Sequence, residues 1–248
     1  MTRKIAIVTG GMGNIGQSIC KVLHQHDIHV VATYHRHGNH ESAKIWQQTQ
    51  EKSGFHFDIA YVDVADFNSC EMMIQKVQNE IGNIDILVNN AGITRDVSCC
   101  KMSKDDWDIV INTDLNSVFY VTRTVINMMK EKHYGRIINI SSINGQRGQF
   151  GQVNYSAAKA GIHGFTKALA KEVARNGITV NTISPGYVES EMIMAIPENV
   201  RSNILHEIPM GRFAHPDEIA RVVAFLADEK SSYITGANIA INGGHYML

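Results

Sequence analysis

A tyrosine and a lysine stand four residues apart in the segment Tyr155-Ser156-Ala157-Ala158-Lys159. On a helix, residues at positions i and i+4 share a face, so the phenol and the ammonium are expected to be neighbours. A free phenol ionises only near pH 10, and a nearby ammonium stabilises the phenolate, which makes proton transfer near neutrality easier. The pair therefore suits a general acid for ketone reduction. Taken alone, the same spacing is also typical of an ordinary amphipathic helix surface.

A third candidate group, a hydroxyl, precedes the tyrosine in the chain. Ser142 directly follows residues 137–141, an apolar stretch that predicts a buried strand. A hydroxyl at this place can hold a carbonyl oxygen while a hydride reaches the carbonyl carbon. The combined spacing of Ser142, Tyr155 and Lys159 favours a catalytic set over a plain helix surface.

Short β-branched segments alternate with helix-length amphipathic segments along the whole chain. The expected strands are 4–8, 28–34, 56–62, 84–89, 135–141, 179–184 and 237–241. The expected helices include 15–26, 42–53, 68–81, 115–132, 152–175 and 216–227. Continuous apolar strands are typical of a parallel sheet buried on both faces, and repeated strand–helix units predict a doubly wound α/β sheet. No linker or repeat interrupts the pattern, so residues 1–248 are expected to form a single domain.

One long irregular stretch, residues 185–216, lies between the last two expected strands. Loops of this length in compact domains usually cover a binding site, so we expect a substrate lid at about 187–215. A pair of short surface helices is the alternative, and the two interpretations are compatible.

The bulk composition is that of an ordinary globular protein, at 44% hydrophobic and 19% charged residues with a net charge of −1. This balance predicts neither a nucleic-acid surface nor a membrane-seeking face. The four cysteines form no C-x-x-C pair, which favours reduced thiols in a cytoplasmic protein over a disulfide framework. The apolar run at 5–8 is too short for a signal peptide or a membrane span, so a soluble, uncleaved chain is expected.

A glycine cluster, TGGMGNIG, follows the first expected strand at residues 9–16. It fits G-x-G-x-x-G through Gly11, Gly13 and Gly16, and it also fits T-G-x-x-x-G-x-G from Thr9, with Asn14 in place of a glycine. Glycines between a strand and a helix let the backbone approach a pyrophosphate, and the helix N-terminus offers free N–H donors. The context therefore predicts a nucleotide site in either frame.

The end of the second expected strand indicates which nucleotide is bound. No carboxylate is present there to bind a ribose 2′-hydroxyl, whereas His35 and Arg36 can meet a 2′-phosphate with positive charge. We therefore expect NADP rather than NAD. Asp63, at the end of the third strand, can accept a hydrogen bond from the adenine amino group. Six of the twelve histidines lie between residues 24 and 40, but their spacing is not that of metal ligands, so no metal is expected.

Taken in order, Thr9-Gly10, the turn 89–92, Ser142, Tyr155-x-x-x-Lys159 and Pro185-Gly186 resemble the short-chain dehydrogenase/reductase family. The resemblance covers essentially the whole chain. It implies a seven-stranded NAD(P)-binding Rossmann sheet and usually a homotetramer. In these roles Tyr155 is the acid, Lys159 also holds the nicotinamide ribose, and Ser142 orients the carbonyl.

The family resemblance also selects the glycine frame that begins at Thr9, and it implies a full set of cofactor contacts. Residues 185–188 would run beside the nicotinamide, with Ser190 in place of the family's usual threonine. The implied contacts are Gly10, Met12, Gly13, Asn14, Ile15, Gly16, His35, Arg36, Asp63, Val64, Asn90, Ala91, Gly92, Tyr155, Lys159, Pro185, Gly186, Val188 and Ser190.

Two residues depart from the family pattern. Asn14 replaces a glycine, and because asparagine readily adopts the left-handed conformation, the turn is expected to survive. Asp114 replaces the fourth catalytic residue, an asparagine, and an ionised carboxylate cannot copy an amide donor. If the backbone carbonyl of residue 114 holds the family's relay water, the exchange is tolerated. We then expect Asp114→Asn to change the rate only modestly.

Within the family, residues 89–96 and 141–161 most resemble acetoacetyl-CoA reductases of polyhydroxybutyrate synthesis. This implies NADPH-dependent reduction of acetoacetyl-CoA to (R)-3-hydroxybutanoyl-CoA, with a pocket formed by Asp96, Ser142, Gln149, Gln152, Tyr155, Gly186 and Tyr187. The related 3-oxoacyl-[acyl-carrier-protein] reductases are the alternative, although they often have arginines where this chain has His133 and Asn176. A non-catalytic NADP(H) sensor is a further alternative, against which the intact catalytic set argues.

Overall fold

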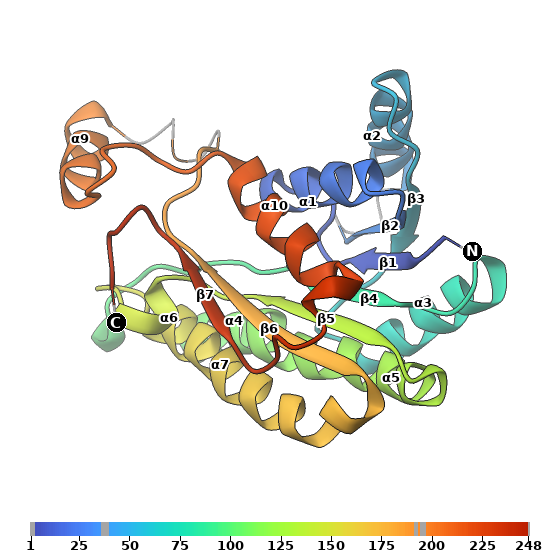
Figure 1. Ribbon diagram of the computed structural model, residues 1–248. Helices are drawn as coiled ribbons and strands as arrows, with labels where there is room; N and C mark the ends of the chain where they lie inside the picture. Colours follow the sequence, from blue (N-terminus) through green and yellow to red (C-terminus); the bar gives the residue numbers. More distant parts are fainter. Residues whose placement is uncertain (1–2, 36–39, 191–192, 194–196, 248) are drawn as a thin grey trace.

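Seven parallel strands form a single sheet at the centre of the molecule (Figure 1). The computed structural model describes residues 3–35, 40–190, 193 and 197–247. The strands are β1 (Ile5–Val8), β2 (His29–Tyr34), β3 (Asp58–Tyr61), β4 (Ile86–Asn89), β5 (Gly135–Ile140), β6 (Ile178–Pro185) and β7 (Asn238–Ile241). Their order in the sheet is β3-β2-β1-β4-β5-β6-β7. The doubly wound α/β fold is therefore confirmed, with all seven strands where the sequence predicts them.

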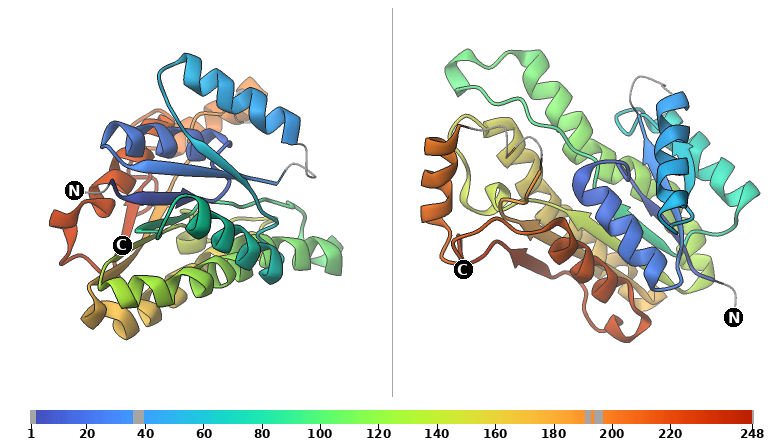
Figure 2. Two further views of the ribbon diagram at one scale, coloured as in Figure 1. Left: turned by 90° about the vertical axis from the view of Figure 1, so that its right-hand side faces the viewer. Right: turned by 90° about the horizontal axis from the view of Figure 1, so that it is seen from above.

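Helices cover both faces of this sheet (Figures 1 and 2). On one face lie α1 (Asn14–Gln25), α2 (His40–Lys52) and α10 (Pro216–Ala227). On the other lie α3 (Phe67–Glu80), α5 (Ser117–Lys132) and α7 (Val153–Val173). Alternate strand residues enter the two cores, since Ala6 and Val8 pack in the first and Ile7 packs in the second. The strands read as continuous apolar runs because both of their faces are buried.

A buried polar chain ties three neighbouring elements together below the carboxyl ends of the strands. Asn89 of β4 donates to Asn139 Oδ1 of β5 at 2.8 Å, and Asn139 donates to Thr166 Oγ1 of α7 at 2.9 Å. All three side chains are buried. The chain fixes α7 relative to the sheet, and α7 carries Tyr155 and Lys159.

The structure adds helical segments that the sequence analysis did not predict. The eight-residue α4 (Lys104–Ile111) continues through a π-helical turn, Asn112–Asn116, into α5. The predicted helix 115–132 therefore begins as α5 only at Ser117. Short α6 (Asn144–Arg147) follows β5, and α9 (Glu198–Glu207) lies within the expected lid. The lid is thus partly helical, and its residues 191–192 and 194–196 lie outside the described part of the chain.

All four cysteines are free, and two of them are buried. Over the residues that the structure describes, no helix is long and apolar enough to cross a membrane. Within the same residues, no three His, Cys, Asp or Glu side chains gather in a way that could hold a metal ion.

Candidate active site

The glycine-rich turn after β1 is tied to the loop after β4. Thr9 Oγ1 accepts the backbone N–H groups of Asn90 at 2.9 Å and Ala91 at 3.1 Å. The Asn90 amide in turn donates to the carbonyls of Thr9 at 2.9 Å and Gly10 at 3.2 Å. These contacts fix both loops at the point where the strand order reverses, which is where open α/β sheets bind ligands. The bracing role of Thr9 was not assigned from the sequence.

The turn can accommodate a pyrophosphate because its glycines leave the backbone uncovered by side chains. Gly10 has a φ of 61°, and a Cβ at Gly16 would lie only 2.3 Å from the Gly10 carbonyl oxygen. Gly13 caps α1 without any side-chain hydrogen bond to the helix. The first N–H groups of α1 therefore remain available to an anion.

Asn14 does not occupy the conformation expected from the sequence. It is the first residue of α1, and among the described non-glycine residues only Asp27 and His133 have a positive φ. The left-handed prediction is wrong because the helix begins one residue earlier, so this position needs no special backbone. The Asn14 amide donates to the Glu189 carbonyl at 2.5 Å, which joins the glycine-rich turn to the segment after β6.

At the adenine end, the carboxylate of Asp63 is engaged on two sides. Its Oδ1 accepts the Ala65 N–H at 2.9 Å, and its Oδ2 lies 3.6 Å from His35 Nε2. His35 is thus beside the end of β2, with the Asp63 carboxylate next to its ring. Arg36 lies outside the described residues.

The predicted catalytic serine follows β5 directly. Ser142 is buried, and its Oγ accepts the backbone N–H of Asn144 at 3.1 Å. Because that oxygen already accepts a bond, the hydroxyl proton is available to a ligand. A Cβ at Gly145 would lie 2.7 Å from the Lys159 carbonyl carbon, so α6 packs directly against α7. This contact brings the serine loop to the helix of the tyrosine and the lysine.

Lys159 and Asp114 form a buried ion pair beside the tyrosine. Lys159 Nζ lies 3.2 Å from Asp114 Oδ2, donates to the Ile140 carbonyl at 3.1 Å, and lies 5.4 Å from the centre of the Tyr155 ring. Asp114 Oδ1 accepts the Ile93 N–H at 2.8 Å. The structure therefore brings together Asp114, Tyr155 and Lys159 as the sequence analysis expected, but with a contact that it did not predict.

Burial and charge oppose each other in this pair. Burial raises the pKa of Asp114, although the Lys159 ammonium and the Ile93 N–H work in the opposite direction. Burial also disfavours the charged form of Lys159, but the Asp114 carboxylate and Tyr155 outweigh it and raise the pKa of the lysine. The ammonium is thus held in its charged form by the protein around it.

Two of the predicted substrate residues, Asp96 and Gln152, lie on one polar chain. Gln152 donates to Asp96 Oδ2 at 2.8 Å and accepts from the Asn144 amide at 2.9 Å. The third, Gln149, accepts separately from Arg147 at 3.2 Å. Asn144 therefore links Gln152 to the loop of Ser142, a role that its position in the sequence did not reveal.

Tyr187 stacks on His245, with ring centres 5.8 Å apart and an angle of 24° between the planes. The His245 ring is held by Arg147 at 2.8 Å and by Glu207 of α9 at 3.2 Å. A cavity of about 320 Å³ adjoins Tyr187 and is lined by residues that follow α9 and end β7. The lid helix is thus connected to the predicted acyl pocket through a C-terminal histidine that sequence reasoning missed.

The segment after Pro185 runs along the same crevice. A Cβ at Gly186 would lie 2.8 Å from the Asn242 Cα, so only glycine permits this approach. Val188 is buried and pairs with Ala214, and Ser190 Oγ accepts the Ile193 N–H at 3.2 Å. The segment therefore has a fixed path between β6 and the lid.

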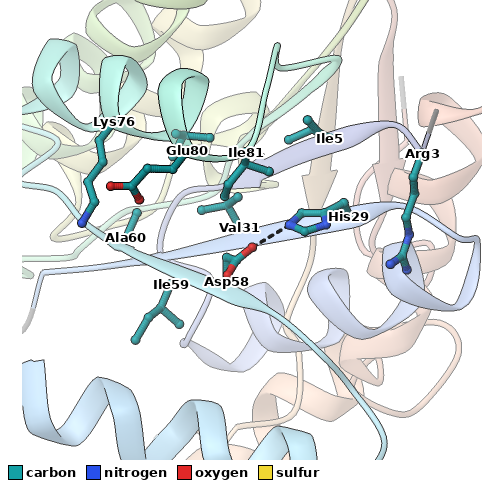
Figure 3. A pocket seen from close by; sticks show the side chains of 11 residues that line it. Arg3, Ile5, His29, Val31, Asp58, Ile59, Ala60, Lys76, Glu80 and Ile81 are labelled. Carbon is teal, nitrogen blue, oxygen red and sulfur yellow. Dashed lines mark hydrogen bonds and ion pairs between the residues drawn. The ribbon is translucent and has the colours of Figure 1, made fainter.

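A larger cavity of about 530 Å³ lies at the opposite, amino end of the strands (Figure 3). His29 and Asp58, at the starts of β2 and β3, pair across it at 2.6 Å, with Lys76 and Glu80 of α3 beside them. Its positive and negative side chains offset one another, and none of the predicted site residues lines it. The crevice at the carboxyl ends of the strands is therefore the candidate active site.

Comparison with known proteins agrees with this geometry. A family model described as enoyl-(acyl carrier protein) reductase matches residues 11–246. The chain belongs to the short-chain dehydrogenase/reductase family. Membership makes it an oxidoreductase that uses a nicotinamide cofactor, as its bare glycine turn and uncapped α1 also indicate.

Three curated relatives illustrate the similarity. The acetoacetyl-CoA reductase of Allochromatium vinosum is 54% identical over 98% of this chain and 99% of the relative. The acetoacetyl-CoA reductase of Cupriavidus necator is 50% identical over the full length of both chains. The 3-oxoacyl-[acyl-carrier-protein] reductase of Escherichia coli is 41% identical over 99% of this chain and 98% of the relative.

Proposed function

We propose that this protein reduces acetoacetyl-CoA to (R)-3-hydroxybutanoyl-CoA with NADPH, as in polyhydroxybutyrate synthesis. The observation that carries the proposal is the packing of the Ser142 loop against the helix of Tyr155 and Lys159, through Gly145, at the carboxyl edge of the sheet. Relatives with the name acetoacetyl-CoA reductase, at 50% identity and above, support the choice of substrate.

The mechanism assigns one task to each side chain. The Ser142 hydroxyl donates a hydrogen bond to the substrate carbonyl oxygen, and the Tyr155 phenol gives its proton to that oxygen as the alcohol forms. The bound reduced nicotinamide supplies the hydride to the carbonyl carbon, so one hydride and one proton complete the reduction. Lys159 stabilises the phenolate left on Tyr155 by its positive charge.

The cofactor is held by the chain on both sides of the crevice. The N–H groups at the start of α1 bind the pyrophosphate, and residues 185–190 line the nicotinamide side. Lys159 also binds the nicotinamide ribose. We assign NADP because β2 ends at Tyr34 and the chain continues with His35 and Arg36, where no carboxylate stands to bind a ribose 2′-hydroxyl and repel a 2′-phosphate.

We further propose a cytoplasmic homotetramer. Exposed apolar side chains support subunit contacts on two separate faces: Trp107, Ile109 and Phe119 on α4 and α5, and Phe225 and Tyr233 on and after α10. Large exposed apolar groups that gather on one face usually mark protein contacts.

NADPH oxidation tests the proposal, with acetoacetyl-CoA as substrate and chiral analysis of the product. Wild-type protein should give the (R) alcohol, and Tyr155→Phe should abolish turnover while it still binds NADPH. Tight NADPH binding without turnover of any 3-oxoacyl thioester would instead favour the sensor alternative. An equal or higher kcat/KM with acetoacetyl-carrier protein would instead indicate a role in fatty-acid synthesis.

A further inference from the structure

The ammonium of Lys159 has three N–H donors, and the fold uses two of them. One goes to the Ile140 carbonyl at 3.1 Å, and one faces Asp114 Oδ2 at 3.2 Å. Both side chains are almost fully buried, with 4% and 0% of their surface exposed. A lysine of this kind has one donor left for a ligand, and its charge is balanced by a carboxylate in contact with it.

The Asp114 carboxylate is oriented so that its Oδ2, and not its Oδ1, faces Lys159. Its Oδ1 accepts the Ile93 N–H at 2.8 Å, which fixes the orientation of the group. Asparagine at this position would keep its oxygen on Ile93 and turn its NH₂ group towards the Lys159 ammonium, donor against donor. The aspartate is therefore required for the pair.

Close packing keeps the pair away from solvent. A Cβ at Gly92 would lie 2.6 Å from Asp114 Oδ2 and 3.2 Å from Lys159 Nζ, so this face is covered by backbone at van der Waals range. Apart from the lysine, Asp114 Oδ2 has no hydrogen-bond partner. In such surroundings charges act on each other much more strongly than in water.

We propose that Asp114 is the counter-ion of Lys159 and a positioning residue that keeps the buried ammonium charged, and thus able to act on the Tyr155 phenol, to higher pH. The inference rests on the proposed role of Tyr155 as the acid. With the carboxylate present, the ammonium has a partner in contact that offsets the cost of its burial. Without the carboxylate, burial would favour the neutral amine, which gives a phenolate no charge stabilisation.

The other groups around Lys159 are few. Tyr155 approaches from α7, Ile140 offers a carbonyl from β5, and the loop after β4 presents the backbone of Gly92 and Ile93. Asp114 and Tyr155 are the ionisable groups whose charges act on the lysine. The carboxylate is therefore the main control on the charge that the phenol experiences.

The test compares Asp114→Asn with the wild type in pH profiles of kcat/KM for acetoacetyl-CoA reduction. The alkaline limb should move down by about one pH unit, because a unit charge at this range acts strongly in a buried site. An alkaline limb at the same pH as in the wild type would overturn the proposal.

A spectroscopic titration gives a second readout that needs neither substrate nor cofactor. Tyrosinate absorbance is followed against pH in Asp114→Asn and in the wild type, each referred to its own Tyr155→Phe version to isolate one phenol. The Tyr155 signal should appear at higher pH in Asp114→Asn, because a neutral lysine no longer stabilises the phenolate, and coincident curves would contradict the counter-ion role. If the enzyme proves inactive towards acetoacetyl-CoA, this titration still decides the inference separately from the proposed function.

Asp85→Asn is the matched control. Asp85 is also buried, accepts the Ile5 N–H at 3.1 Å and pairs with Lys132, but it lies just before β4, at the opposite end of the strand. Asp85→Asn should lower the free energy of unfolding, but it should shift neither the kcat/KM profile nor the tyrosinate titration. Asp114→Ser, which removes charge without an amide, should reproduce the shift of Asp114→Asn. Equal shifts in Asp85→Asn would show that any lost buried pair has this effect and would overturn the proposal.

Discussion

Ser142 shows how one backbone contact prepares a side chain for catalysis. Its oxygen accepts the Asn144 N–H at 3.1 Å, and this bond does not use the hydroxyl proton, which a ligand can accept. Loss of one such donor in a preorganised site typically costs about 100- to 1,000-fold in rate. We therefore expect the serine to contribute mainly to kcat rather than to cofactor binding.

At this scale we predict that Ser142→Ala lowers kcat for acetoacetyl-CoA reduction by about 100-fold while NADPH affinity stays within about twofold. Stopped-flow kinetics and fluorescence titration measure the two quantities. Ser156→Ala is the control: Ser156 Oγ is buried without a partner beside Tyr155, so its removal should leave kcat nearly unchanged. A wild-type kcat in Ser142→Ala would remove the serine from the mechanism.

Single residues also show which features of the site could be predicted from the sequence and which could not. Ser142, Tyr155 and Lys159 were predictable because their types and spacing follow one strand and one helix. The Lys159–Asp114 pair joins residues from two separate helical segments, which local spacing cannot reveal. Asn14 was assigned to a left-handed turn because the helix start was placed one residue late.

At the scale of elements, apolar runs and glycine turns predicted the seven strands and most helices, because a sheet buried on both faces leaves a strong pattern. The eight-residue α4 was missed, although Ser103 caps it by accepting the Asp106 N–H at 3.0 Å. The π-helical turn 112–116 was also missed, because no glycine or proline marks it between α4 and α5. Packing decides such details, as at Gly145, where α6 meets α7.

We predict that Gly145→Ala lowers kcat by about 10- to 100-fold, because the added methyl group would displace the Ser142 loop from α7. The new Cβ would meet the Lys159 carbonyl carbon at 2.7 Å and the Ala160 nitrogen at 2.9 Å. Gly164 lies on α7, and a Cβ there would have no neighbour within 4 Å, so Gly164→Ala is the control. This control should keep full activity and gain about 1 kcal/mol in the free energy of unfolding. Full activity in Gly145→Ala would contradict the positioning role of this contact.

At the scale of the whole molecule, the exposed apolar side chains support the proposed subunit contacts. Phe119 on α5 is 49% exposed, and Trp107 and Ile109 on α4 are 40% and 43% exposed. We predict that Phe119→Glu shifts the protein from a tetramer to smaller species in light scattering, because a charge is costly in an apolar contact. Ile45→Glu, on the surface of α2, should leave the mass unchanged. A wild-type monomer would refute the tetramer directly.

One set of measurements tests both the proposed substrate and the proposed cofactor. We would measure kcat/KM for NADPH and NADH, each with acetoacetyl-CoA, longer 3-oxoacyl-CoA thioesters and acetoacetyl-carrier protein. We predict the highest kcat/KM for NADPH with acetoacetyl-CoA, and no turnover for Tyr155→Phe. A higher value with the carrier-protein thioester, or turnover that survives in Tyr155→Phe, would contradict the proposal.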